Sequence, residues 1–205
     1  MEGRHCFVMA VDSASCFVPP SDECLLARLV TGDRQALEEL FGRYRLLAYR
    51  VAYRLLNHEA DALDAVQEGF VKALTHLSSF QGRSSFKTWL LRVVSNAALD
   101  LGRQRSRRET ISLDAPDAAD RQGCQPVALH DPSRSLERAD LRKLLDEALA
   151  TLPLAQRQTF VLHADAELSY REVAETLGIS IGTVMSRLYY ARQKLRIFLA
   201  ERIKS

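Results

Sequence analysis

Apolar residues recur every three or four positions along most of the chain, which is the spacing of one face of an α-helix. Segments with strand character do not alternate with helical ones, and this argues against a nucleotide-binding α/β domain. The pattern predicts an all-α protein made of two small helical bundles joined by a flexible linker. The bundles are expected at residues 21–108 and 134–205, the linker at residues 109–133 and a disordered extension at residues 1–20.

The first bundle is predicted to contain four helices. Ser21, Asp33 and Ser85 precede three of them, and short polar side chains at that position accept hydrogen bonds from the free N–H groups of a helix start. The third helix is expected at residues 60–77, with its larger apolar side chains facing inward. These inward positions are Leu63, Val66, Phe70, Leu74 and Leu77.

Two features of the first bundle suggest chemistry. Asp61, Asp64 and Glu68 share the opposite stripe of the third helix, which is either a solvated face or a docking face for a basic partner. The fourth helix, at residues 85–107, ends in the arginines 103, 105, 107 and 108. Positive charge beside aromatic residues suits single-stranded nucleic acid as well as an ordinary solvated helix end.

The second bundle contains the most informative stretch, LSYREVAETLGISIGTVMSRLYYARQKLR at residues 168–196. Ser169 and Glu172 form the S-x-x-E pattern of a capping box. Gly178 is placed to end the first helix in a left-handed conformation, and Ser180 can cap the next. A short helix, a three-residue turn and a longer basic helix are the layout of a helix-turn-helix. An ordinary helical hairpin is the alternative, and we favour DNA binding.

Composition adds little to this picture. The net charge of +2 is close to neutral, and no apolar run is long enough to span a membrane. The apolar run at residues 6–11 is too short for a signal peptide and is stopped by Asp12, so a cytoplasmic location is expected. The four cysteines form no C-x-x-C pair, and a metal site built from His5, Cys6, Cys16 and Cys24 is improbable. We expect no metal, no cofactor and no catalytic residue.

Three motifs in this order resemble a bacterial RNA polymerase sigma factor of the extracytoplasmic-function (ECF) group. DALDAVQEGFVKAL at residues 61–74 looks like the family's core-polymerase-binding helix, and FQGRSSFKTWLLRVVSNAALDLGRQ at residues 80–104 looks like the segment that melts and reads the promoter −10 element. Residues 168–196 look like the helix-turn-helix that reads the −35 element. In three places the chain departs from the family pattern: Leu63 stands where an acidic residue is common, Gly69 stands where an aliphatic one is common, and Met185 replaces a frequent lysine.

The resemblance implies a role for particular residues. Binding to the coiled coil of the largest polymerase subunit is implied for Asp61, Asp64, Gln67, Glu68 and Phe70. Contact with −10 DNA is implied for Phe80, Arg83, Lys87, Trp89, Arg92, Asn96, Asp100 and Arg103. Contact with −35 DNA is implied for Arg171, Ser180, Thr183, Met185, Ser186, Arg187 and Tyr190.

The resemblance also implies the partners and leaves rivals to test. Core RNA polymerase, through its coiled coil and its flap, and promoter DNA are expected partners, and an anti-sigma factor is left open. A helix-turn-helix activator that does not replace a sigma factor is the main alternative, but it leaves residues 61–108 unexplained. The other rival is a metal-dependent nuclease built on Asp61, Asp64 and Glu68.

Overall fold

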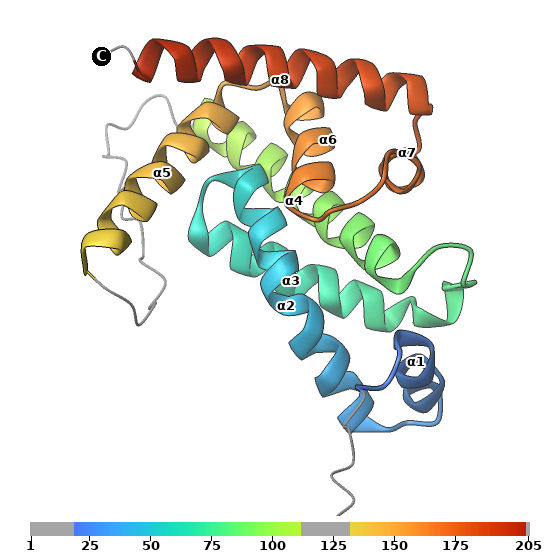
Figure 1. The fold of residues 1–205 in the computed structure, drawn as a ribbon. Coiled ribbons are helices and arrows are strands. Elements are labelled where there is room, and N and C mark those ends of the chain that lie inside the picture. The colour runs from blue at the N-terminus through green and yellow to red at the C-terminus, as the bar shows by residue number, and fades with distance from the viewer. Residues whose placement is uncertain (1–18, 112–131, 204–205) are drawn as a thin grey trace, which may run out of the picture. The chain divides into compact units, whose positions relative to one another are not determined.

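The computed structural model in Figure 1 describes residues 19–111 and 132–203. Every regular element within these two ranges is helical: eight α-helices and one short 3-10 helix, η1. This confirms the predicted all-α class. Residues 1–18 and 112–131, which include most of the predicted extension and linker, lie outside the described ranges. The division into bundles at residues 21–108 and 134–205 therefore stays a prediction.

Contacts divide the chain into two units, the first ending at Leu40 and the second beginning at Phe41. The first unit holds α1 (Asp22–Val30) and the start of α2 (Arg34–Leu56). Ser21 Oγ accepts a hydrogen bond from Cys24 N at 3.3 Å, and Asp33 Oδ1 accepts one from Gln35 N at 2.9 Å. Both helix starts are capped as the sequence predicts.

In the second unit, α3 (Glu59–Thr75) runs alongside α4 (Phe86–Ile111) (Figure 1). The segment that connects them along the chain contains η1 (Leu77–Ser79). The two helices pack closely at Gly69. A Cβ atom at this position would lie 2.7 Å from Val94 Cγ2 and 3.0 Å from Val94 Cα, which is closer than carbon atoms pack. The two helices can lie this near each other only because residue 69 has no side chain.

The inward face of α3 differs from the prediction at two positions. Val66 and Phe70 are buried as expected, but Leu63 and Leu74 are 53% and 37% exposed. The side chains that face the interior are instead mostly small, because a close helix crossing leaves room for little else. They are Ala62, Ala65, Val66, Gly69, Phe70 and Ala73.

The remaining helices are α5 (Pro132–Ala150), α6 (Leu154–Ala164), α7 (Tyr170–Leu177) and α8 (Ile181–Ile203). The break between α5 and α6 falls at residues 151–153, as predicted from the Thr-Leu-Pro sequence. α8 packs on both α6 and α7 (Figure 1). Its buried stripe repeats at helical spacing and consists of Val184, Leu188, Ala191 and Leu195.

Two arginines connect the helices of the second unit. Arg54 on α2 forms ion pairs with Asp146 on α5 and, at 3.6 Å, with Asp165 after α6. Arg157 on α6 donates hydrogen bonds to the carbonyl oxygens of Leu55 at 3.1 Å and Ala150 at 2.8 Å, which lie at the ends of α2 and α5. Burial raises the pKa of both aspartates, and Arg54 opposes that rise.

Candidate nucleic-acid and polymerase interface

The helix-turn-helix forms through the local signals read in the sequence. Ser169 Oγ accepts a hydrogen bond from Glu172 N at 3.3 Å, and Glu172 Oε2 accepts one from Ser169 N at 2.8 Å, which is a complete capping box. Gly178 ends α7 with φ of 64°, in the left-handed region where glycine is favoured. Ser180 Oγ then accepts a hydrogen bond from Thr183 N at 3.1 Å and caps α8.

The predicted −35 residues occupy one side of the first half of α8. Ser180, Met185, Ser186 and Tyr190 are exposed, whereas Thr183 and Arg187 are half-buried at the border of that side. Tyr190 is 54% exposed and forms an edge-to-face contact with Tyr189, the ring centroids being 5.4 Å apart. This surface has the polar groups, the basic residue and the helix start that a major-groove reading helix requires.

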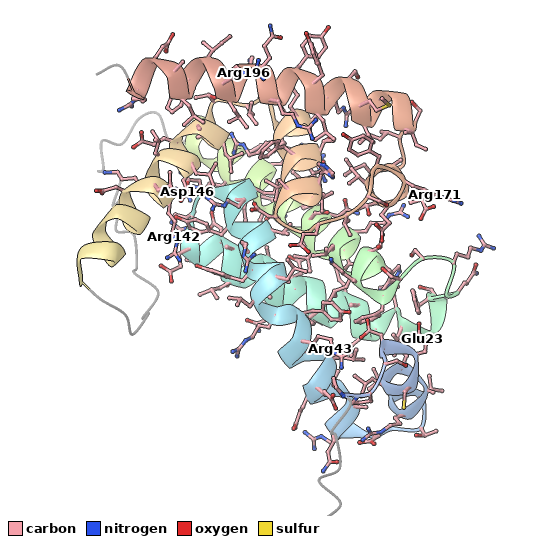
Figure 2. The ribbon with its side chains drawn as sticks, viewed as in Figure 1. Glu23, Arg43, Arg142, Asp146, Arg171 and Arg196 are labelled. Carbon is pink, nitrogen blue, oxygen red and sulfur yellow. The ribbon has the colours of Figure 1, made fainter. Side chains whose placement is uncertain are left out.

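Arg171 is the one predicted −35 residue that lies on α7. Its side chain projects away from the helix (Figure 2), is 83% exposed and pairs with Glu175 at 3.3 Å. The neighbouring Glu172 links α7 to α4, because Thr88 Oγ1 donates a hydrogen bond to Glu172 Oε1 at 3.3 Å. Hydrogen bonds from Ser169 hold the pKa of Glu172 below its ordinary value, so its carboxylate is charged at neutral pH.

The predicted −10 residues on α4 separate into an exposed face and an aromatic cluster. Arg92, Asn96, Asp100 and Arg103 are exposed, at spacings of three and four that place them on one face. Lys87 is half-buried and lies apart from that face. Arg103 Nη2 donates to Asp100 Oδ1 at 2.9 Å, so the charges of these two residues partly neutralise each other.

The aromatic cluster lies at the start of α4. Phe80, in the loop before the helix, is 5.3 Å from Trp89 and 6.0 Å from Phe86 between ring centroids. Phe80 and Trp89 are half-buried, whereas Phe86 is 8% exposed. The same loop presents an exposed Arg83 next to Gly82, whose φ is 66°. A partly open aromatic surface beside a positive charge is a surface on which an unpaired base can stack.

The outer face of α3 combines charge with apolar surface. Asp64 and Gln67 are exposed, and Glu68 is half-exposed and pairs with Lys72 at 2.6 Å. Leu63 and Val71, 53% and 57% exposed, lie on the same face. From the sequence, Leu63 was predicted to face inward, and Val71 was assigned to neither face. Their helical positions relative to Asp64 were the signal that could have found them.

Two predicted polymerase-binding residues do not lie on that open face. Phe70 is 3% exposed and packs against Phe41 in a tilted arrangement with ring centroids 3.8 Å apart, so its ring belongs to the core. Asp61 is 26% exposed and binds Arg105 of α4 at 2.9 Å. The resemblance placed all five residues together, but burial and pairing separate these two from Asp64, Gln67 and Glu68.

A shallow apolar groove lies on the second half of α8. It has a volume of about 450 Å³ and is lined by Phe160 of α6 together with five residues of α8. Two arginines, one of them Arg196 (Figure 2), form part of its wall. The α8 residues are Arg192, Leu195, Arg196, Leu199 and Ala200.

Within the described ranges, no three His, Cys, Asp or Glu side chains come together in a way that could hold a metal ion. Cys24 is described and exposed, but the other residues weighed for a metal site lie outside those ranges. No described helix is both long and apolar enough to cross a membrane.

Comparison with known families matches the two parts of the chain separately. Residues 40–108 match the family described as Sigma-70 region 2, and residues 142–195 match the family described as Sigma-70, region 4. The first match covers α3, most of α4 and the loop between them, and the second covers α7 and the first part of α8. A helical protein with both regions in this order belongs to the sigma-70 class.

Comparison with individual proteins identifies the group within this class. The chain is 35% identical over 192 residues to the ECF RNA polymerase sigma factor SigE of Mycolicibacterium smegmatis, covering 91% of this chain and 72% of that protein. The chain therefore belongs to the ECF RNA polymerase sigma factors.

Two solved structures have a fold similar to that of this chain. CnrH in complex with the cytosolic domain of CnrY has a TM-score of 0.65 at 27% identity, covering 88% of this chain and 97% of CnrH. The sigma factor RpoE in complex with the anti-sigma factor NepR from Bartonella quintana has a TM-score of 0.63 at 25% identity, covering 80% and 98%.

Proposed function

We propose that this protein is a promoter-selecting subunit of bacterial RNA polymerase, which binds the core enzyme and directs it to specific promoters in the cytoplasm. The observation that carries the proposal is the presence on one chain of an acidic docking face, an aromatic and basic helix start, and a helix-turn-helix. The role is one of binding, and the polymerase performs the chemistry. Neither rival function accounts for all three surfaces.

Docking on the coiled coil of the largest subunit falls to the outer face of α3. Asp64, Gln67 and Glu68 supply polar groups, while Leu63 and Val71 supply apolar surface that binding would remove from water. A face with both kinds of group is typical of protein interfaces, whose apolar centre is surrounded by a polar rim. Phe70 supports this face from inside by packing on Phe41.

Recognition of the −10 element falls to the start and the exposed face of α4. Phe80 and Trp89 offer aromatic surface to unpaired bases, and Arg83, Arg92 and Arg103 offer charge to the phosphates. Lys87, Asn96 and Asp100 are the further residues that the family resemblance assigns to this contact.

Recognition of the −35 element falls to the first half of α8. Ser186 and Tyr190 are exposed and would reach base edges in the major groove, while Thr183 and Arg187 lie at the border of that face. Ser180 precedes the same helix and Met185 lies on its first turns, and the exposed Arg171 of α7 would contact phosphates.

Two further partners are part of the proposal. The polymerase flap would dock on the second bundle, where the groove on α8 offers an apolar depression next to Arg192 and Arg196. An anti-sigma factor would regulate the protein, because the similar RpoE from Bartonella quintana was solved with the anti-sigma factor NepR.

In vitro transcription tests the function. Core polymerase is incubated with genomic fragments with and without the protein, and the transcripts are sequenced at their 5′ ends. We expect initiation at defined sites only when the protein is present. An activator would instead bind DNA without converting core enzyme into an initiating one, and a nuclease would cut the fragments when a divalent metal is added.

A further inference from the structure

One ion pair joins the beginning of α3 to the end of α4. Arg105 Nη1 donates to Asp61 Oδ2 at 2.9 Å, across 44 positions in the sequence. The two helices run in opposite directions, because an earlier residue of α3 meets a later residue of α4. Gly69 lies against Val94, whereas Asp61 pairs with Arg105. The pair therefore lies at the end of the two-helix hairpin remote from the loop at residues 76–85.

Asp61 is held on its own helix as well. The imidazole of His58, which precedes the first turn of α3, accepts a hydrogen bond from Asp61 N at 3.2 Å. The same His58 Nδ1 lies 3.3 Å from Asp61 Oδ1. With one carboxylate oxygen beside His58 and the other on Arg105, Asp61 is oriented toward α4. Asp64, one turn later on α3, is exposed and forms no ion pair with any described residue.

Arg105 lies on the α3 side of α4. It follows Val94, the residue against Gly69, by eleven positions, which is three helical turns and returns to the same face. Three residues before it, α4 packs closely on α2 at Gly102, where a Cβ would lie 3.2 Å from Leu56 Cδ2. The pair therefore supports α4 one turn beyond its packed part, while Arg103 and Arg107 remain exposed.

We propose that Asp61 is a positioning residue for promoter DNA and does not contact the core polymerase. By binding Arg105 it fixes the direction of the basic end of α4, so that Arg103 and Arg107 can hold phosphates. The inference rests on the proposed function and divides the residues that the resemblance placed in one polymerase-binding set. Surface ion pairs add little to stability, so loss of this pair should disorder the end of α4 without unfolding the protein.

The variant Asp61→Asn tests this in the reconstituted holoenzyme, with a promoter fragment identified by in vitro transcription as the DNA. Removing a negative charge should by itself tighten DNA binding. Loss of positioning predicts the opposite, a promoter affinity about two- to fivefold weaker, which is the range that an exposed ion pair can supply. The salt dependence should also decrease, by up to about one phosphate contact. Core affinity and the circular dichroism spectrum should not change.

Matched variants provide the controls. Asp64→Asn makes the same charge change three residues along α3, and should weaken core binding without weakening the promoter affinity of assembled holoenzyme. Asp140→Asn, on the exposed part of α5, makes that charge change away from both surfaces and should alter neither affinity. The double variant Asp61→Arg with Arg105→Asp reverses the pair and should restore promoter affinity that each single change lowers.

Three results would overturn the role of Asp61: a loss of core affinity in Asp61→Asn like that of Asp64→Asn, promoter binding that is unchanged or tighter, or failure of the reversed pair to restore it. Initiation by the unaltered protein tests the proposed function independently. A negative result on Asp61 therefore leaves that function standing, and absence of initiation by the unaltered protein would reject both.

Discussion

At the scale of single residues, the hydroxyl groups of the first turns of α8 are already bonded within their own helix. Ser180 Oγ accepts from Thr183 N at 3.1 Å and lies 2.9 Å from Thr183 Oγ1, and Ser186 Oγ donates to Thr183 O at 3.0 Å. Each hydroxyl still has capacity for one more bond, so it can meet a base edge without giving up the cap. Their positions are fixed before DNA arrives, which lowers the entropy cost of binding.

Arg187 has no such fixed partner among the described residues, and its place at the border of the face favours a phosphate contact. We predict that Arg187→Ala weakens binding to all −35 sequences by a similar factor and lowers the salt slope by about one. Binding to a library of single-base −35 variants, measured at two salt concentrations, checks this. Arg142→Ala, which removes an exposed arginine of α5, serves as the charge control. A cost of about 1–3 kcal/mol confined to one base position would instead mean that Arg187 reads a base.

At the scale of elements, the crossing of α3 and α4 depends on a missing side chain. In Gly69→Ala the added methyl group must move Val94 or separate the helices, which costs about 1–3 kcal/mol. The better helix propensity of alanine offsets at most about 1 kcal/mol of that. We therefore predict a net loss of stability in urea unfolding.

Gly42→Ala is the matched control, because Gly42 is a helical glycine of α2 with nothing within 4 Å of its added Cβ. It should gain up to about 1 kcal/mol. If both variants gained stability, the close approach at Gly69 would not be the constraint that the structure indicates.

The capping box of α7 gives a prediction about pH. Hydrogen bonds from Ser169 lower the folded-state pKa of Glu172 below its ordinary value of 4.5. A lowered carboxyl pKa contributes stability that is complete above the unfolded-state pKa and is lost as pH falls through the folded-state pKa. Glu172→Gln should therefore be less stable than the unaltered protein at pH 7, and the difference should shrink below about pH 4.5.

Urea unfolding across that pH range measures the effect. Ser169→Ala, which costs about 1 kcal/mol as a lost cap, should reduce the pH dependence contributed by Glu172. An equal difference at every pH would contradict the assignment of the shift to the cap.

Elements were predictable from sequence where their signals are local. Ser169, Glu172, Gly178 and Ser180 define α7 and α8 within a dozen positions, and the structure has both as expected. The inward face of α3 was not predictable in the same way. Its small residues give a weak hydrophobic signal, and which stripe turns inward is decided by how closely α4 approaches, a contact made across 25 positions between Gly69 and Val94.

The candidate site shows the same limit. The exposed Asp64 was identifiable from helical spacing, and the exposed Ser186 was identified through the family resemblance. The burial of Phe70 and the pairing of Asp61 with Arg105 depend on the neighbouring helix and could not be read from their own segment. Pairs distant in sequence leave no local periodicity, so a single sequence gives no signal for them.

At the scale of the whole molecule, a net charge of +2 conceals opposite local surfaces. The outer face of α3 is acidic, while the end of α4 and the flanks of α8 are basic. Separate surfaces of opposite sign let one chain bind a basic protein site and polyanionic DNA at the same time. The local distribution of charge, rather than its sum, carries the information about partners.

We predict that Asp64→Arg combined with Glu68→Arg weakens core polymerase binding while the helical fold survives. The side chains are exposed or half-exposed, and the Glu68–Lys72 pair at 2.6 Å is a surface pair that contributes at most about 1 kcal/mol. A basic partner would then meet like charge. Affinity for core enzyme, measured alongside circular dichroism, checks this.

Glu38→Arg with Asp140→Arg applies the same charge change to other exposed positions and should leave the affinity for core polymerase unchanged. Equal losses in both double variants would indicate a general charge effect.

The hydrogen bonds of Arg157 bear on how such proteins can be recombined. Its guanidinium reaches the carbonyl oxygens of Leu55 and Ala150, so the segment that carries the helix-turn-helix completes the end of a helix from the earlier segment. Sigma factors with new specificities are an obvious target for engineering by exchange of whole segments. A hybrid joined between residues 112 and 131 would carry Arg157 into a host whose α2 equivalent was never matched to it. Joining partners for such hybrids should therefore be chosen by the residue pairs that cross the junction, starting with Arg157 and with Arg54.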